Sequence, residues 1–265
     1  KMLVAVAKPA GLLSVPARDL SITDSLEARL RARYPGARRV LLVDLLFGFC
    51  QGIAGTLFVF YFQYVLGFAT TSNALLFIYF VSGLIGVPLW MWVGRRWGKH
   101  RGLQAAFVYT AITTLLIILM PAGNFPVVAV AMAIAGLSQG GGILLTRALM
   151  ADVVDADELE TGARRSGLYF GLLLTTSKIA IVAGPLALVF LQLLGFDAGL
   201  GGQNSDAMLF ALGAMFIGAP AFFALAAAWL LENYPLDEKA QAALAEAIAA
   251  RHSANSENTL GPVTK

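Results

Sequence analysis

Six long apolar runs follow one another along the chain and make up most of its length. They lie near Leu41–Leu66, Asn73–Val93, Leu103–Met120, Val127–Leu149, Leu168–Leu194 and Ala207–Leu231. A helix needs about 20 mostly apolar residues to cross the hydrocarbon core of a bilayer. In lipid the backbone must satisfy its own hydrogen bonds, so each run predicts a transmembrane helix. The pattern therefore predicts an all-α membrane protein, built as a bundle of six transmembrane helices.

Polar stretches on both sides of these runs divide the chain into three parts. Residues 1–39 form a non-membrane N-terminal segment, residues 40–232 the six-helix transmembrane domain, and residues 233–265 a polar tail. In the tail, Leu236, Ala240, Leu244 and Ile248 recur at helical spacing. This spacing predicts a short amphipathic helix over Pro235–Arg251.

The composition agrees with a membrane protein and excludes several classes of site. Apolar residues make up 58% of the chain and charged residues 13%, whereas soluble domains contain about 25% charged residues. The single cysteine, Cys50, cannot form an internal disulfide or a cysteine-based metal site. No phosphate-binding, zinc-protease or paired-cysteine motif occurs. We therefore predict no catalytic residues, no metal, no organic cofactor and no nucleic-acid partner.

The distribution of basic residues between the runs predicts an orientation. The link after the second run carries a basic loop, and Arg147, Arg164 and Arg165 border the link between the fourth and fifth runs, whereas the links on the opposite face carry no Lys or Arg. The residues of the basic loop are Arg95, Arg96, Lys99 and Arg101. By the positive-inside rule the basic links face the cytoplasm. We expect a multi-pass protein of the inner (cytoplasmic) cell membrane, with both termini cytoplasmic.

One charged side chain, Lys178, lies in the middle of the fifth run. Its stem is too short to reach the surface of a bilayer core about 30 Å thick, so the ammonium group is expected to face protein or a wet cavity. A charge inside a membrane often marks a transport path. Thr175, Gln139 and Tyr169 are further candidates for lining a substrate or cation site, although each could also pack between helices.

The glycine-rich sequence Gln139–Gly142 lies in the fourth run. It lacks the strand and the lysine of a phosphate-binding loop, so it is interpreted as a site of close helix packing or bending.

A hydrophilic segment, Ala151–Gly167, follows the fourth run and is expected to be a loop. Its beginning, ADVVDADE followed by TG and an arginine, resembles the glycoside–pentoside–hexuronide:cation symporter family of the major facilitator superfamily. The basic loop also resembles that superfamily, and the similarity covers about Arg38 to Arg251. Ala156-Asp157 replaces the aromatic residue and glycine that are common in the family.

This resemblance implies half of a transporter, namely its C-terminal six helices. It implies cation-coupled symport of a sugar or glycoside by alternating access, with Na⁺ or H⁺ as the coupling cation. Lys178 would lie beside the sugar and cation sites. Cytoplasmic ion pairs that hold two halves together would involve Asp152, Asp155, Glu158 and Arg164. The expected partners are membrane lipid, the sugar, and an N-terminal half or a second copy of the chain.

A different resemblance concerns residues 7–40. Ala7–Pro16 (AKPAGLLSVP), Asp24–Glu27 and Tyr34-Pro35 look like the start of an RluA-type pseudouridine synthase. Where that family has its catalytic His-Arg-Leu-Asp motif, this chain has Leu41–Asp44 (LLVD). The alternative function is therefore an inactive RNA pseudouridine synthase fragment fused to a membrane segment. Asp44 is then interpreted as a polar residue at the mouth of the first span. A non-transporting membrane scaffold is a third alternative.

Overall fold

The computed structural model describes residues 35–161, 165–232 and 234. The N-terminal segment resembling pseudouridine synthases, except for its last residues, and the predicted tail helix lie outside the described residues. The elements are α2 (Pro35–Phe60), the π-helical turn η1 (Tyr61–Val65), α3 (Ser72–Trp97), α4 (Lys99–Leu116), the 3₁₀ turn η2 (Ile117–Leu119), α5 (Phe125–Gly136), α6 (Ser138–Thr161), α7 (Ser166–Ile181), α8 (Ala183–Leu193), the 3₁₀ segment η3 (Ala198–Gln203) and α9 (Asp206–Leu230). No strand occurs in these ranges.

The prediction of six transmembrane helices is confirmed in the described part of the chain. Six helical stretches are long and apolar enough to cross a membrane. They are Gly36–Val65, Ser72–Trp97, Lys99–Leu119, Phe125–Leu159, Ser166–Leu193 and Asp206–Leu230. Large apolar side chains such as Phe77, Leu84 and Trp229 are exposed on them. Because lipid or another apolar bundle can cover such a surface, the exposure agrees with a membrane location.

Two of the six stretches are interrupted, which the apolar pattern does not reveal. The fourth is broken at Leu137, between α5 and α6, and the fifth at Val182, between α7 and α8. The prediction of a loop from Ala151 onward is wrong as far as Thr161, because α6 continues to that residue. No glycine or proline occurs between Ala148 and Thr161, so nothing in the local sequence ends the helix before Gly162.

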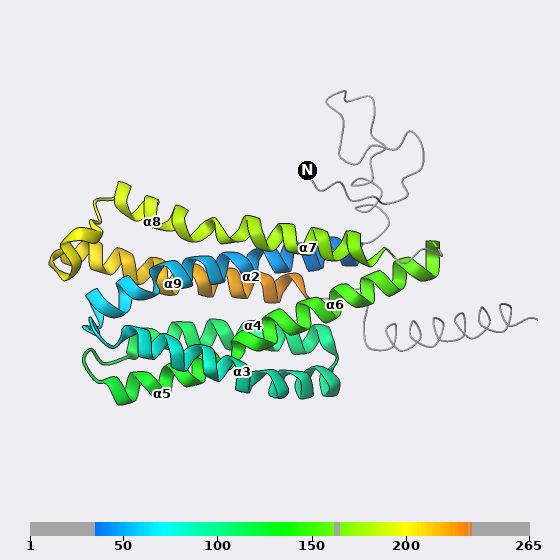
Figure 1. Ribbon diagram of the computed structural model, residues 1–265, viewed down its shortest axis with the longest axis horizontal. Coiled ribbons are helices and arrows are strands. Elements are labelled where there is room, and N and C mark those ends of the chain that lie inside the picture. Colours follow the sequence, from blue (N-terminus) through cyan, green and yellow to red (C-terminus); the bar gives the residue numbers. More distant parts are fainter. Residues whose placement is uncertain (1–34, 162–164, 233, 235–265) are drawn as a thin grey trace, which may run out of the picture.

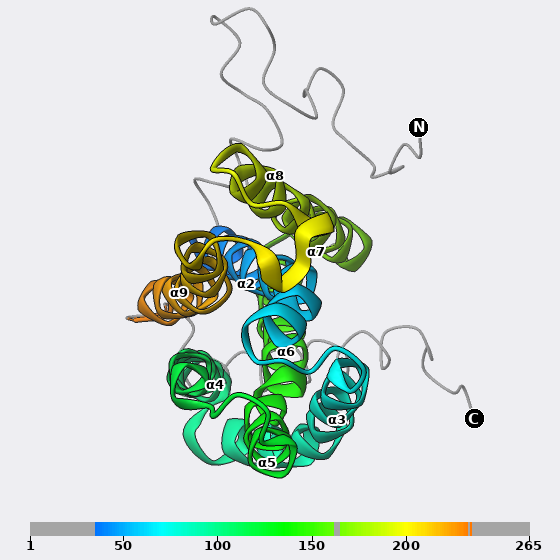
Figure 2. The same ribbon diagram turned by 90° about the vertical axis from the view of Figure 1, so that its left-hand side faces the viewer.

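The helices form two groups that meet along the middle of the bundle. In one group α2 packs against α7, α8 and α9, and in the other α3 packs against α5 and α6. Contacts of α4 with α9 and of α2 with α6 join the groups. Figure 2 looks along the helices and shows α2 and α6 near the centre of the bundle. In Figure 1, α2 begins at the same end of the bundle at which α9 ends.

Glycines allow the close approach of α3 to the break between α5 and α6. A Cβ atom on Gly136 would overlap the backbone of Tyr79, and one on Gly86 would overlap the backbone of Leu137. Gly141 and Gly142 lie in the same way against the rings of Trp90 and Phe47. The glycine-rich stretch thus serves close packing, as its composition indicated.

The substitution Gly136→Ala is expected to destabilise the bundle by about 1–3 kcal/mol, because the new methyl group meets backbone that cannot rotate away. Thermal unfolding of the detergent-solubilised protein measures the effect. Gly218→Ala in α9 is the control, since a Cβ atom there meets nothing within 4 Å. A Gly136→Ala variant as stable as the Gly218→Ala control would contradict the close approach.

Candidate functional site

A cavity of about 550 Å³ lies between α2, α6, α7 and α8. Apolar side chains form most of its wall, and three of them, Ile143, Leu174 and Ile181, are exposed on the bundle. The cavity therefore reaches the surface of the bundle. Its lining residues are Asp44, Phe47, Gly48, Gln51, Gly52, Gly55, Thr56, Ile143, Arg147, Leu173, Leu174, Ser177, Ile181 and Pro185.

Asp44 connects α2 to α7 inside this cavity. Its Oδ2 atom accepts hydrogen bonds from the hydroxyl groups of Thr176, at 2.7 Å, and Ser177, at 2.8 Å. Asp44 lies eight residues after Gly36, about 12 Å along the helix. The interpretation of Asp44 as a residue at the mouth of the first span stays a prediction. Its carboxylate belongs to the contact between two membrane helices.

Arg147 and Lys178 are the positively charged residues in the middle part of the described bundle. Arg147, on α6, lines the cavity and is close enough for its charge to act on Asp44. Arg147 forms no ion pair or hydrogen bond with a described side chain. Lys178, on α7, is exposed and also has no such partner. One carboxylate and two cations therefore leave this part of the described bundle with a net positive charge.

A smaller cavity, of about 280 Å³, lies on the other side of Gln51. Gln51 and Gly55 belong to the walls of both cavities. The Gln51 amide nitrogen donates a hydrogen bond to Oε1 of Gln139, and the Tyr79 hydroxyl donates to the same oxygen at 3.2 Å. This polar trio connects α2, α3 and α6 and separates the two cavities.

The four residues predicted to bind substrate or cation do not line one cavity. Gln139 lines the smaller cavity. Tyr169 is fully buried in the core near the start of α7, whereas Lys178 lies near the end of that helix. Thr175 is exposed and its hydroxyl donates to the backbone carbonyl of Gly171, at 2.9 Å, in its own helix. Lys178 belongs to neither wall. The cavity residues Asp44 and Arg147 were missed, although an arginine and an aspartate inside apolar runs were a visible signal.

The predicted basic loop and acidic segment meet at one end of the bundle. The Lys99 ammonium group, at the start of α4, lies 2.5 Å from Oδ1 of Asp152 on α6. Arg95, Arg96 and Arg101 are exposed around this pair. Lys99 of the predicted basic loop thus pairs with Asp152 of the predicted gating residues, and this ion pair connects α4 to α6.

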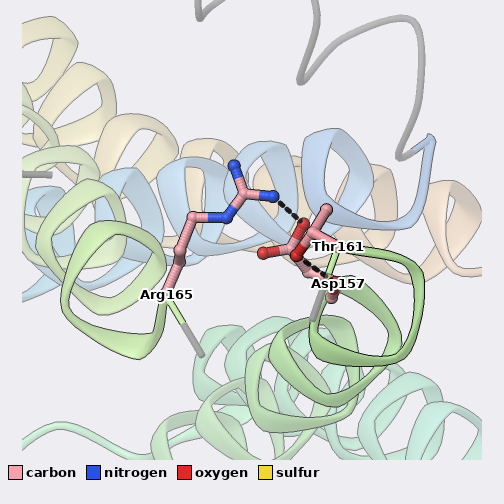
Figure 3. A network of polar contacts seen from close by, with 3 residues as sticks. All are labelled: Asp157, Thr161 and Arg165. Atoms are coloured by element: carbon pink, nitrogen blue, oxygen red, sulfur yellow. Dashed lines mark hydrogen bonds and ion pairs between the residues drawn. The ribbon is translucent and has the colours of Figure 1, made fainter. Parts of the chain in front are cut away.

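A second ion pair at this end was not predicted. Nη2 of Arg165, just before α7, lies 2.9 Å from Oδ1 of Asp157 on α6, and the Asp157 side chain is fully buried. The Thr161 hydroxyl donates to the backbone carbonyl of Asp157, at 2.7 Å, one turn earlier in the helix. Figure 3 shows Arg165 reaching across to Asp157. The pair connects the end of α6 to the start of α7.

The other predicted gating residues have different surroundings. Asp155 and Glu158 are half-buried on α6, and Asp155 forms no ion pair with a described residue. Arg164 lies outside the described residues. Arg165, the neighbour of Arg164, is the arginine that pairs with an α6 carboxylate in the described chain.

Tyr234 packs against the same end of the bundle. Its ring lies nearly parallel to that of His100, with the centroids 6.1 Å apart. Burial raises the pKa of the Tyr234 phenol, and the nearby carboxylate of Asp152 raises it further. The phenol therefore stays neutral and fills an apolar contact between the end of α9 and α4.

Comparisons with known proteins agree with these features. The sodium-dependent lysophosphatidylcholine symporter 1-A of Danio rerio is 23% identical over 243 residues, covering 87% of this chain and 45% of that protein. Its Homo sapiens counterpart is 26% identical over 185 residues, covering 69% of this chain and 34% of the relative. The glucuronide carrier protein homolog of Escherichia coli strain K12 is 27% identical over 183 residues, covering 68% of this chain and 40% of that protein. The chain spans less than half the length of each relative.

The match to a known family extends over most of the chain. Residues 17–238 match the model of the MFS/sugar transport protein family. This match begins inside the segment that resembles pseudouridine synthases, and the comparisons give that resemblance no support. A transporter family and a bundle of membrane helices also agree with a protein that is not an enzyme. With a six-helix fold and a family match over residues 17–238, the chain belongs to the MFS/sugar transport protein family.

Proposed function

We propose that the chain is one six-helix half of a secondary transporter that works by alternating access. The observation that carries this proposal is the cavity of about 550 Å³, which holds Asp44 and Arg147 and reaches an exposed apolar face of the bundle. A site between two halves, near the middle of the membrane, is the arrangement expected for this mechanism. The partner would be an N-terminal half or a second copy of the chain.

The proposed transport is symport of a sugar or glycoside with Na⁺ or H⁺. The family description includes sugar transport, and one relative is named as a glucuronide carrier homolog. A second candidate substrate is a lysophospholipid, because two relatives are named as sodium-dependent lysophosphatidylcholine symporters. The predominantly apolar wall of the cavity favours a substrate with an apolar part.

Two ion pairs support a gating role for the end of the bundle that carries the basic loop. Lys99–Asp152 and Asp157–Arg165 connect α6 to the helices beside it. A pair that forms in one conformation and opens in another requires only a few kcal/mol between the two states. We place this end on the cytoplasmic side of the inner membrane, because the basic residues cluster there.

Uptake by proteoliposomes tests the proposed function. Vesicles that contain only this chain are expected to show no uptake of radiolabelled glycoside or lysophosphatidylcholine above protein-free vesicles, because half of the cavity wall is missing. Vesicles that also contain a second six-helix half are expected to show uptake that depends on a Na⁺ or H⁺ gradient. Uptake by the chain alone, with the protein monomeric in the vesicle, would contradict the two-half mechanism.

A further inference from the structure

The larger cavity contains a cation, Arg147, that has no hydrogen-bond or ion-pair partner among the described residues. Away from the two ends of the bundle, the charged residues of the described ranges are Asp44, Arg147 and Lys178. Thr176 and Ser177 already donate hydrogen bonds to the Asp44 carboxylate. The guanidinium group of Arg147 lines the cavity and makes no hydrogen bond or ion pair with a described residue. The cavity wall therefore includes a guanidinium group whose five N–H donors bond no described residue.

The position of Arg147 favours an anionic partner. Arg147 lies five residues before Asp152, whose carboxylate pairs with Lys99 at the end of the bundle, so Arg147 lies about 7.5 Å deeper along the same helix. A guanidinium group stays protonated in proteins and cannot avoid the cost of apolar surroundings by losing its proton. Arg147 is exposed in the described half, so its donors are open to water or to a group from outside the described chain, and a charged partner becomes favourable once the cavity closes over it.

We propose that Arg147 binds the anionic group of the substrate, a carboxylate or a phosphate, and that it determines a preference for anionic amphiphiles. This proposal rests on the proposed transport function and names the substrate class of the same cavity. The planar guanidinium group matches both anions with two parallel hydrogen bonds. The apolar wall, with Leu173, Leu174 and Ile181, contacts the apolar part of the substrate.

The negative charge of Asp44 is compatible with an anion bound to Arg147. Its charge is shared with two hydroxyl donors from α7, on the side of the cavity away from α6. Asp44 and Arg147 offset each other in the cavity wall, and the exposed Lys178 on α7, outside that wall, brings the sum of the three charges to one positive. A neutral sugar would leave the guanidinium group without a charged partner, which costs more in a low-dielectric site than in water.

Two pairs of matched ligands test the proposal and separate the two sources of anion. The carboxylate pair is 4-nitrophenyl β-glucuronide and 4-nitrophenyl β-glucoside. The phosphate pair is a lysophosphatidic acid and the monoacylglycerol with the same acyl chain. Affinities are measured in nanodiscs that contain the full chain and the second half. The anionic member of at least one pair is expected to bind about ten- to a hundredfold more tightly, as for a hydrogen-bonded charge.

Variants of Arg147 identify the residue responsible. Arg147→Gln is expected to remove the preference, and Arg147→Lys to keep part of it, because lysine retains the charge but not the planar fork. Arg95→Gln is the matched control, since it removes the same charge from an exposed position on α3, a helix that does not line the cavity. The control is expected to keep the full preference. Thermal unfolding without ligand confirms that each variant is folded.

Several results would overturn the assignment. If Arg147→Gln keeps the preference, another group recognises the anion. If the wild-type protein binds neutral and anionic members equally, the substrate class is wrong, while the proposed transport function stands. If Arg147→Gln weakens both members equally and lowers the stability of the assembled halves, Arg147 pairs with a carboxylate of the second half instead. If neither pair binds, the proposed transport function fails together with the assignment.

Discussion

Replacing Asp157 by alanine is expected to lower the free energy of unfolding by about 3–5 kcal/mol, because it leaves the charge of Arg165 without its buried partner. The Asp157 side chain is fully buried and Arg165 is half-buried, with 2.9 Å between the paired atoms. Water therefore cannot replace the lost carboxylate at low cost. Thermal or denaturant unfolding in detergent, followed by circular dichroism, measures the difference.

The matched control for this substitution is Asp155→Ala, two residues earlier on α6. Asp155 is half-buried and forms no ion pair with a described residue, so its replacement is expected to change stability by less than about 0.5 kcal/mol. The double variant Asp157→Ala/Arg165→Gln is expected to recover part of the loss, because it removes both charges. Equal effects at positions 155 and 157 would show that the buried pair does not hold α6 to α7.

Replacing Lys178 by leucine is expected to reduce coupled uptake by about tenfold or more in vesicles that contain both halves, the loss expected when a hydrogen bond to a charged group is removed. Lys178 is exposed on α7, on a helix that borders the larger cavity. Since leucine is far easier to insert at this depth than lysine, the variant is expected to be at least as stable as the wild-type protein.

This combination distinguishes a transporter from a passive membrane scaffold. In a scaffold the ammonium group only lowers the stability of the protein in the membrane, so Lys178→Leu would raise the unfolding temperature and change no activity. The control is Ile179→Leu, the next residue on the same exposed stretch of α7, which keeps an apolar side chain. Uptake by Lys178→Leu equal to that of the Ile179→Leu control would contradict a role for Lys178 in transport.

The fold was largely predictable because the membrane restricts the possible backbone structures. Long apolar runs such as Asn73–Val93 must be helical in lipid, and α3 covers this run completely. The breaks at Leu137 and Val182 lie inside apolar runs. The local signals near them are the glycine-rich Gln139–Gly142, interpreted as a site of packing or bending, and Pro185, which lacks the N–H that would bond the carbonyl of Ile181. The close approach of Gly136 to Tyr79 and of Gly184 to Gly52, which accompanies these breaks, depends on helices far apart in the sequence.

The candidate site was predictable only in part. Lys99 and Asp152 were each recognised as members of charged groups, but their pairing follows from the packing of α4 against α6. Asp157 replaces a residue common in the related family and was therefore treated as a departure, although its carboxylate is buried against Arg165. Its helical surroundings were also unexpected, because α6 continues to Thr161.

The sequence by itself determined the membrane environment, the number of spanning helices and the separation of links with basic residues from links without them. These properties depend on the length and polarity of continuous segments, which are local. Only the tertiary structure decided which charges share a cavity and which form pairs. Asp44, Arg147 and Ser177 lie on three helices, and more than 100 residues separate Asp44 from Ser177 along the chain. Side-chain hydrogen bonds act over about 3 Å, so the packing of α2 between α6 and α7 had to be known before this site could be recognised.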